Sequence, residues 1–94
     1  MLRRINSRMD SVETKIRAIV AEISNLPTDM PAGANLYLDL GVASVHALQL
    51  LTELEERFGV AIPDDRFVEA ASINELTALM TSLTQSQTED AARA

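Results

Sequence analysis

Apolar residues recur at steps of three and four in three segments of this 94-residue chain, and this spacing most constrains its fold. Residues so spaced lie on one face of an α-helix, whereas a strand requires a two-residue alternation, which the sequence lacks. The first and last segments carry Val12, Ile16, Ile19, Val20 and Ile23, and then Ile73, Leu76, Leu79, Met80 and Leu83. The sequence therefore predicts an all-α fold of packed amphipathic helices.

The middle segment predicts a helix over residues 44–58. Gly59 follows it as a natural stop, because glycine adopts the left-handed conformation that ends many helices. The expected core-facing stripe consists of Val45, Leu48, Leu51 and Leu54, widened by Leu50 and Phe58.

Two pairs of residues have the spacing of a helix-capping box. Asp10 and Glu13 predict a first helix over residues 11–25, with the aspartate as the N-cap. Ser72 and Glu75 repeat the spacing and predict the start of a last helix that ends near residue 83.

The two connections between these helices differ in character. Between the second and last helices, Asp64 or Asp65 is expected to cap a brief helix that ends at Glu69 and buries Phe67 and Val68. Prolines and a glycine interrupt residues 27–35, which predicts a long ordered loop. The loop's end is expected to be anchored in the core by Leu36, Tyr37, Leu38 and Leu40. We therefore expect a small four-helix bundle with three longer helices, one short helix and a long loop between helices one and two.

The net charge of −6 is unevenly spread. Residues 1–17 hold five basic and two acidic side chains, and the rest of the chain holds three basic and twelve acidic ones. An acidic body repels nucleic acids and anionic membranes and attracts basic protein surfaces. We expect a basic arm over residues 1–9, a folded domain over 10–83 and a polar tail over 84–94.

Several classes of protein are disfavoured by what the sequence lacks. It has no cysteine, so neither a disulfide nor a thiolate metal site is available. No apolar run reaches the roughly 18 residues that span a bilayer. We expect a cytoplasmic monomer with no membrane span and no nucleic-acid partner.

Catalysis has little support in the sequence. His46 is the single histidine, and two residues after Ser44 it points about 200° away around a helix. A nucleophilic serine needs a base within reach, and one histidine with scattered carboxylates offers no metal-ligand cluster. We expect no enzyme and no metal site.

Ser44 stands where a loop turns into the second helix. The unpaired N–H groups and the positive end of the helix dipole at such a position favour an attached phosphate. Serine is also a preferred N-cap, and the local sequence alone favours that simpler role.

The wider pattern around Ser44 adds a second argument. Residues 36–65 read LYLDLGVASVHALQLLTELEERFGVAIPDD. This segment closely resembles the acyl carrier protein family, whose signature is an acidic-Leu-Gly-x-Asp-Ser-Leu turn, an apolar helix, Glu-Glu-x-Phe-Gly and Ile-Pro. The resemblance covers about residues 10–83, with its pieces in the family's order, and implies a helical bundle of the acyl-carrier type.

The resemblance implies that Ser44 bears 4′-phosphopantetheine, transferred from coenzyme A by a phosphopantetheinyl transferase. The chain would then be a free-standing, specialised carrier of thioester-linked acyl intermediates, served by loading and processing enzymes with basic docking surfaces. Two residues depart from the family pattern: Ala43 replaces an aspartate that helps to engage the modifying enzyme, and Val45 replaces a leucine. The expected docking residues are Val45, His46, Gln49, Glu55 and Glu56.

Three alternatives stay open on the sequence. The LEERFGVAIPDD signature favours a fatty or polyketide acyl cargo, whereas Ala43 and the neutral start of helix two favour an aminoacyl or peptidyl carrier with a dedicated adenylating ligase. An unmodified acidic adaptor would dock through Glu53, Glu55, Glu56, Asp64 and Asp65. Separately, Val45, Leu48, Leu54, Ile62, Phe67 and Ala71 either form plain core or line a cleft for cargo.

Overall fold

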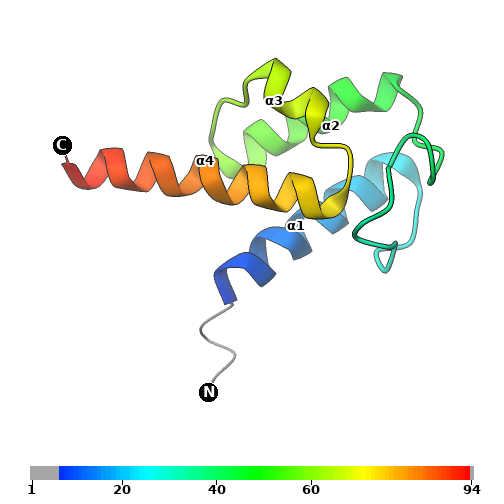
Figure 1. The fold of residues 1–94 in the computed structure, drawn as a ribbon, viewed down its shortest axis with the longest axis horizontal. Helices are drawn as coiled ribbons and strands as arrows, with labels where there is room; N and C mark the ends of the chain where they lie inside the picture. Colours follow the sequence, from blue (N-terminus) through cyan, green and yellow to red (C-terminus); the bar gives the residue numbers. More distant parts are fainter. Residues whose placement is uncertain (1–6, 94) are drawn as a thin grey trace.

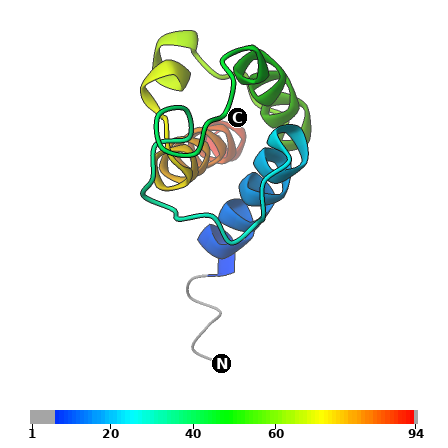
Figure 2. The same cartoon turned by 90° about the vertical axis from the view of Figure 1, so that its right-hand side faces the viewer.

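The computed structural model describes residues 7–93, which fold into four α-helices without a strand (Figure 1). The helices are α1 (Ser7–Ser24), α2 (Val45–Phe58), α3 (Asp64–Glu69) and α4 (Ile73–Arg93). Helix α1 packs against both α2 and α4, and α3 packs against α4 (Figure 2). The predicted all-α bundle of three longer helices and one short helix is confirmed. No described helix is long and apolar enough to cross a membrane.

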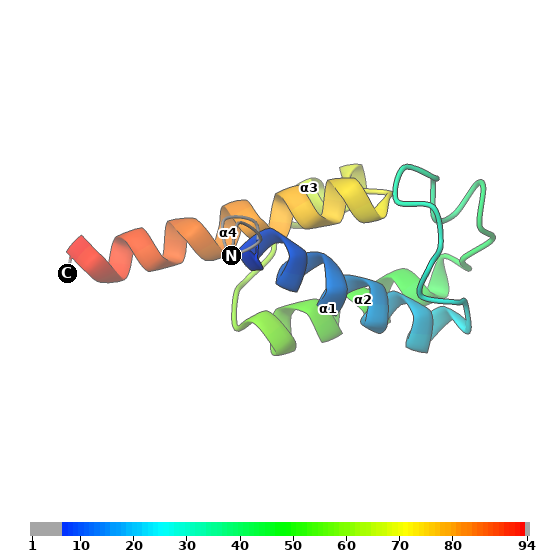
Figure 3. The same ribbon diagram turned by 90° about the horizontal axis from the view of Figure 1, so that it is seen from below.

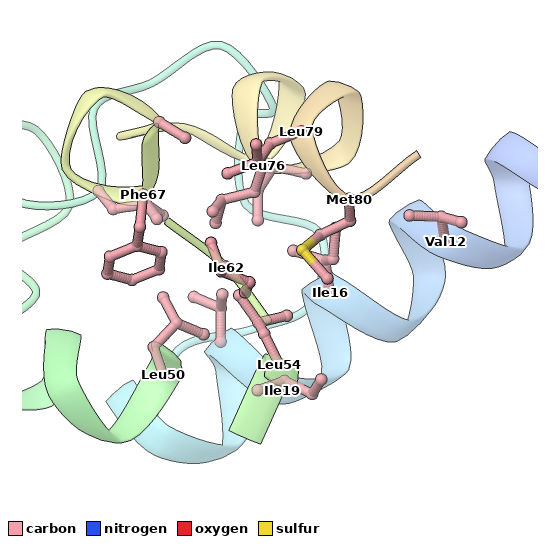
Figure 4. Close-up of a cluster of buried hydrophobic side chains, with 14 of the residues drawn as sticks. Val12, Ile16, Ile19, Leu50, Leu54, Ile62, Phe67, Leu76, Leu79 and Met80 are labelled. Carbon is pink, nitrogen blue, oxygen red and sulfur yellow. The ribbon is translucent and has the colours of Figure 1, made fainter. Parts of the chain in front are cut away.

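One hydrophobic core, made mostly of aliphatic side chains, joins the four helices. Figure 4 shows side chains converging from α1 (Ile16, Ile19), α2 (Leu50, Leu54), α3 (Phe67) and α4 (Leu76, Met80). The predicted faces of the first and last helices are confirmed, because each of their apolar residues is buried or packs against this core. Those helices each carry a single apolar stripe, so periodicity identifies the buried face directly.

The predicted core face of α2 is confirmed at Leu50 and Leu54 and wrong at Val45 and Leu48. Leu50 and Leu54 are almost fully buried, whereas Val45 and Leu48 are each 71% exposed. Leu51 and Phe58 are half-buried beside the core. Helix α2 has apolar residues on two adjacent faces, and only one of them meets α1 and the core, so spacing alone does not identify the buried face.

Two of the predicted helix starts are shifted. Helix α1 begins at Ser7, so Asp10 lies inside the helix and is not its N-cap. The N-cap of α3 is Pro63, which places Asp64 and Asp65 in the first turn. Acidic side chains there still interact favourably with the helix dipole. The predicted burial of Val68 is also wrong, since this α3 side chain is exposed.

The last helix begins as predicted and is longer than predicted. Glu75 N–H donates to Ser72 Oγ at 3.1 Å, and Glu75 Oε1 accepts from Ala71 N–H at 3.0 Å, which confirms the capping box. Helix α4 then continues past the end of its apolar stripe to Arg93. At the other end of the chain, most of the predicted basic arm, including Arg3 and Arg4, lies outside the described residues.

The connection from α1 to α2 runs across the end of the bundle where α4 begins (Figure 3). Leu36 N–H donates to Ala71 O at 2.8 Å, and Asn74 N–H donates to Ala32 O at 3.0 Å. Arg17 holds its first half, because Nη1 donates to the carbonyls of Thr28 at 2.8 Å and of Met30 at 2.7 Å. The predicted ordered loop is thus built from backbone hydrogen bonds as well as apolar anchors.

The apolar anchors of this loop differ in part from those predicted. Leu36 is fully buried, and Tyr37 and Leu40 pack against the core, as expected. Leu38 was expected among them and is instead 85% exposed. Asn35 Oδ1 accepts from the N–H groups of both Tyr37 and Leu38, and this tight turn directs Leu38 outward. Met30 and Val42 are buried anchors that the sequence interpretation missed.

Candidate functional site

A tight turn presents Ser44 at the surface. Gly41 has a φ of 75°, and a Cβ at this residue meets nothing within 4 Å. Glycine is therefore favoured by the left-handed backbone and not by crowding. The next residue, Val42, is buried, and its N–H donates to Leu36 O at 2.9 Å. With Val42 held in the core, the chain emerges at Ala43 and Ser44, both of which are exposed.

Ser44 is the N-cap residue of α2, but its side chain does not cap the helix. Its φ of −63° and ψ of −25° are already helical, and the hydroxyl makes no capping hydrogen bond. A serine that caps has an extended backbone, from which Oγ reaches the N–H two or three residues ahead. The capping role that the local sequence favours is therefore wrong, and the exposed Oγ is available for attachment.

The backbone around Ser44 suits a phosphodiester. His46 N–H donates to Ala43 O and Ala47 N–H to Ser44 O, at 2.9 and 3.0 Å. Among the described residues, no backbone carbonyl accepts from the N–H groups of Ser44 or Val45. The 14-residue α2 directs its positive end here and has no acidic side chain in its first turn. A phosphate attached to Oγ would therefore lie near two available N–H donors, and no carboxylate in the first turn of α2 would repel it.

The five expected docking residues occupy different environments. Val45 and Gln49 are exposed near Ser44, and Glu56 is exposed further along α2. His46 is half-buried, and its Nδ1 is enclosed without a hydrogen-bond partner within the described part of the chain. Glu55 Oε2 accepts from Ile62 N–H at 2.9 Å and so serves the fold. Only Val45 and Gln49 are thus both exposed and close to Ser44.

A groove between α2 and α3 opens beside this part of α2. Its volume is about 290 Å³, and it is lined by Ala47, Leu48, Leu51, Asp64, Phe67 and Val68. Of the residues considered for a cargo cleft, Leu48 and Phe67 line this groove, whereas Leu54 and Ile62 are buried core outside it. Val68 was missed as a surface residue. The available signal was its place beside Phe67 on a six-residue helix, since so short a helix has room to bury little more than one large side chain.

The described residues give Ser44 no catalytic partner. They contain no group of three or more His, Cys, Asp or Glu side chains able to hold a metal ion. The one resolved pKa shift belongs to Tyr37, where burial raises the pKa of the phenol by desolvation. The arrangement offers an exposed hydroxyl at the start of α2.

A family model described as a phosphopantetheine attachment site matches residues 14–80. The matched range runs from α1 to α4 and includes the turn at residues 41–44. It lies within the folded domain expected from the sequence.

Proposed function

Because the chain belongs to the phosphopantetheine attachment family, whose domains carry 4′-phosphopantetheine covalently, we propose that Ser44 is its attachment residue. On this proposal the chain shuttles thioester-linked acyl intermediates between biosynthetic enzymes. The observation that carries it is that Ser44, at the N-terminus of α2, is exposed and that its Oγ makes no capping hydrogen bond.

The other helix starts within the matched range support this choice. The N-cap of α3 is Pro63, which has no hydroxyl. The N-terminus of α4 has Ser72, which is buried and whose Oγ accepts the capping hydrogen bond from Glu75 N–H. Ser44 is the residue at these three helix starts that combines a hydroxyl with exposure.

The attachment step is a phosphoryl transfer from coenzyme A. The bond between Ser44 Oγ and phosphorus forms as the pyrophosphate bond of coenzyme A breaks, adenosine 3′,5′-bisphosphate leaves, and the Oγ proton passes to a base of the transferase. The attached group supplies a thiol, which this cysteine-free chain lacks, for thioester formation. The N–H groups of Ser44 and Val45 and the dipole of α2 would stabilise the attached phosphodiester.

An aminoacyl or peptidyl carrier is the second candidate. It is favoured by the uncharged, exposed Ala43 and by the lack of an acidic side chain in the first turn of α2. A fatty-acyl carrier of the signature family has an acid before its serine. Loading with amino acids by an adenylating ligase, against loading with acyl groups, distinguishes the two cargoes.

Intact mass spectrometry tests the attachment. The chain is incubated with coenzyme A and a broad-specificity phosphopantetheinyl transferase, together with Ser44→Ala and a control, Ser82→Ala, which alters an exposed serine on α4. We expect wild type and the control to gain one phosphopantetheine and Ser44→Ala to gain none. An unmodified wild type would favour the adaptor, and modification of Ser44→Ala would place the group elsewhere.

A further inference from the structure

We propose that the transferase that modifies Ser44 docks on an apolar surface of this chain, made of Val45, Leu48 and Val68, and not on its acidic side chains. This inference rests on the proposed function and adds the chemistry of the partner. The three residues are called the apolar docking surface below.

The apolar docking surface is continuous and begins beside Ser44. It contains three of the four large apolar side chains that the described chain exposes, with exposures of 71% for Val45 and Leu48 and 74% for Val68. Val45 and Leu48 are one turn apart on the same face of α2. Leu48 and Val68 line the same groove between α2 and α3. Exposed apolar groups that cluster in this way are typical of interaction sites.

The acidic side chains of α2 are distant or engaged. Residues 44–52 contain no Asp, Glu, Lys or Arg. Glu53 accepts from Arg57 Nε at 3.2 Å, and Glu55 accepts from Ile62 N–H. Arg57 also lies 3.4 Å from Glu22 of α1, so it ties the far end of α2 to the bundle. Glu56 is exposed but lies about 18 Å along the helix axis from Ser44.

Acidic side chains of α3 do adjoin the apolar docking surface, since exposed Asp65 and Glu69 lie on the same short helix as Val68. Asp64 lines the groove beside Leu48 and Val68. Each exposed carboxylate contributes little net affinity, because water and salt screen it. A basic partner surface placed over Val45 and Leu48 would lose its hydration without a counter-charge there, whereas an apolar surface would gain from the area buried.

We assign the apolar docking surface to the transferase because the atom that the transferase modifies, Ser44 Oγ, belongs to the folded chain itself. Before modification there is no flexible arm, so the transferase must bring its active site to Ser44 Oγ and therefore cover the adjacent Val45. Enzymes that act later reach the cargo through the arm and face no such requirement.

Binding and modification are measured separately. Ser44→Ala cannot be modified at this residue. Calorimetric titration of this variant with the broad-specificity phosphopantetheinyl transferase therefore gives a dissociation constant that no modification reaction disturbs. Within that background we compare Leu48→Gln and Val68→Thr with a control, Glu56→Gln. We expect each apolar substitution to weaken binding, by about tenfold for Leu48→Gln. The control and a rise from about 50 to about 500 mM NaCl should each change binding by less than about threefold.

The rate of mass gain gives the second measurement. With Ser44 present, Leu48→Gln should lower kcat/KM for modification by a similar factor, mainly through KM, and Glu56→Gln should leave it within about twofold of wild type. All the substituted side chains are exposed, and thermal unfolding checks that each variant folds. If Leu48→Gln fails to fold, Val68→Thr on α3 provides the same comparison.

The possible failures are distinguishable. If wild type gains no phosphopantetheine, the proposed function fails and this inference fails with it. If wild type is modified, but the apolar variants bind as tightly as their parent while Glu56→Gln or salt weakens binding, docking is by charge and only the inference is overturned. It is also overturned if sedimentation shows a dimer that Leu48→Gln dissociates, because the surface then belongs to a second copy of the chain.

Discussion

Replacing Gly41 with alanine tests whether the turn before α2 positions Ser44. Gly41 has a φ of 75°, and a Cβ built there meets no atom within 4 Å. The substitution therefore introduces no clash, and its whole cost is the strain of an L-residue in the left-handed region. That strain is about 1–2 kcal/mol.

Two other glycines provide matched controls. Gly59, the C-cap of α2, has a φ of 67° and equally open surroundings, but it lies at the opposite end of the helix from Ser44. Gly33 has no positive φ, and its Cβ would lie 3.9 Å from Asn74 Nδ2, an ordinary contact. Gly59→Ala should cost the same 1–2 kcal/mol, roughly, and Gly33→Ala should be neutral or stabilise by up to about 1 kcal/mol.

Urea unfolding measures the change in the free energy of unfolding, and the rate of phosphopantetheine attachment measures the change in how Ser44 is positioned. Gly41→Ala and Gly59→Ala should lower the unfolding midpoint by similar amounts, whereas only Gly41→Ala should slow attachment at Ser44. Gly41→Asn should recover part of the lost stability, because asparagine tolerates the left-handed region. The reasoning is refuted if Gly33→Ala destabilises as much as Gly41→Ala, or if Gly59→Ala slows attachment equally.

Two further predictions concern the loop between α1 and α2. Arg17→Met should destabilise the fold by about 1–3 kcal/mol and increase amide exchange in residues 25–31, because it removes hydrogen bonds to two loop carbonyls and to Glu13; urea unfolding and hydrogen exchange check this. Burial raises the pKa of Tyr37, so the folded state holds the phenolic proton more tightly than the unfolded state. This contribution is complete below the ordinary pKa near 10 and is lost as the pH rises through the higher folded value. Unfolding midpoints should therefore fall above about pH 10 in wild type and fall less in Tyr37→Phe.

The capping boxes show what local sequence predicts and where it fails. The pairs Asp10/Glu13 and Ser72/Glu75 have the same spacing, yet only the second starts a helix. Ala70, shortly before Ser72, has a φ of −91° and a ψ of 85°, so the chain enters α4 from a non-helical conformation. Before Asp10 the backbone is already helical from Ser7. A capping box marks a helix start only where the residues before it are not helical. The spacing of its two residues does not show whether this is so.

The position of the candidate site follows from the sequence, but the geometry of Ser44 does not. Gly41, Ser44 and the apolar helix that follows are enough to indicate an anion-favouring helix start. The helical φ and ψ of Ser44, which keep Oγ from capping, depend on long-range contacts: buried Val42 and its hydrogen bond to Leu36 O set the direction from which the chain enters α2. Local propensity favoured a cap, and the tertiary anchor of the loop prevents it.

The two residues of α2 whose burial was wrongly predicted, Val45 and Leu48, belong to the proposed docking surface. A helix with two adjacent apolar faces can bury either one, and stability alone favours covering both. Here Leu50 and Leu54 are buried while Val45 and Leu48 stay exposed next to Ser44, although each exposed side chain forgoes the free energy of burial. Sequences depart from such local consistency mainly at functional sites, where the unused burial becomes available to a partner. On this argument, replacing both exposed residues with polar ones should leave the stability of the isolated chain almost unchanged and reduce binding of the transferase, whereas Leu54→Ala should cost about 2–5 kcal/mol of stability.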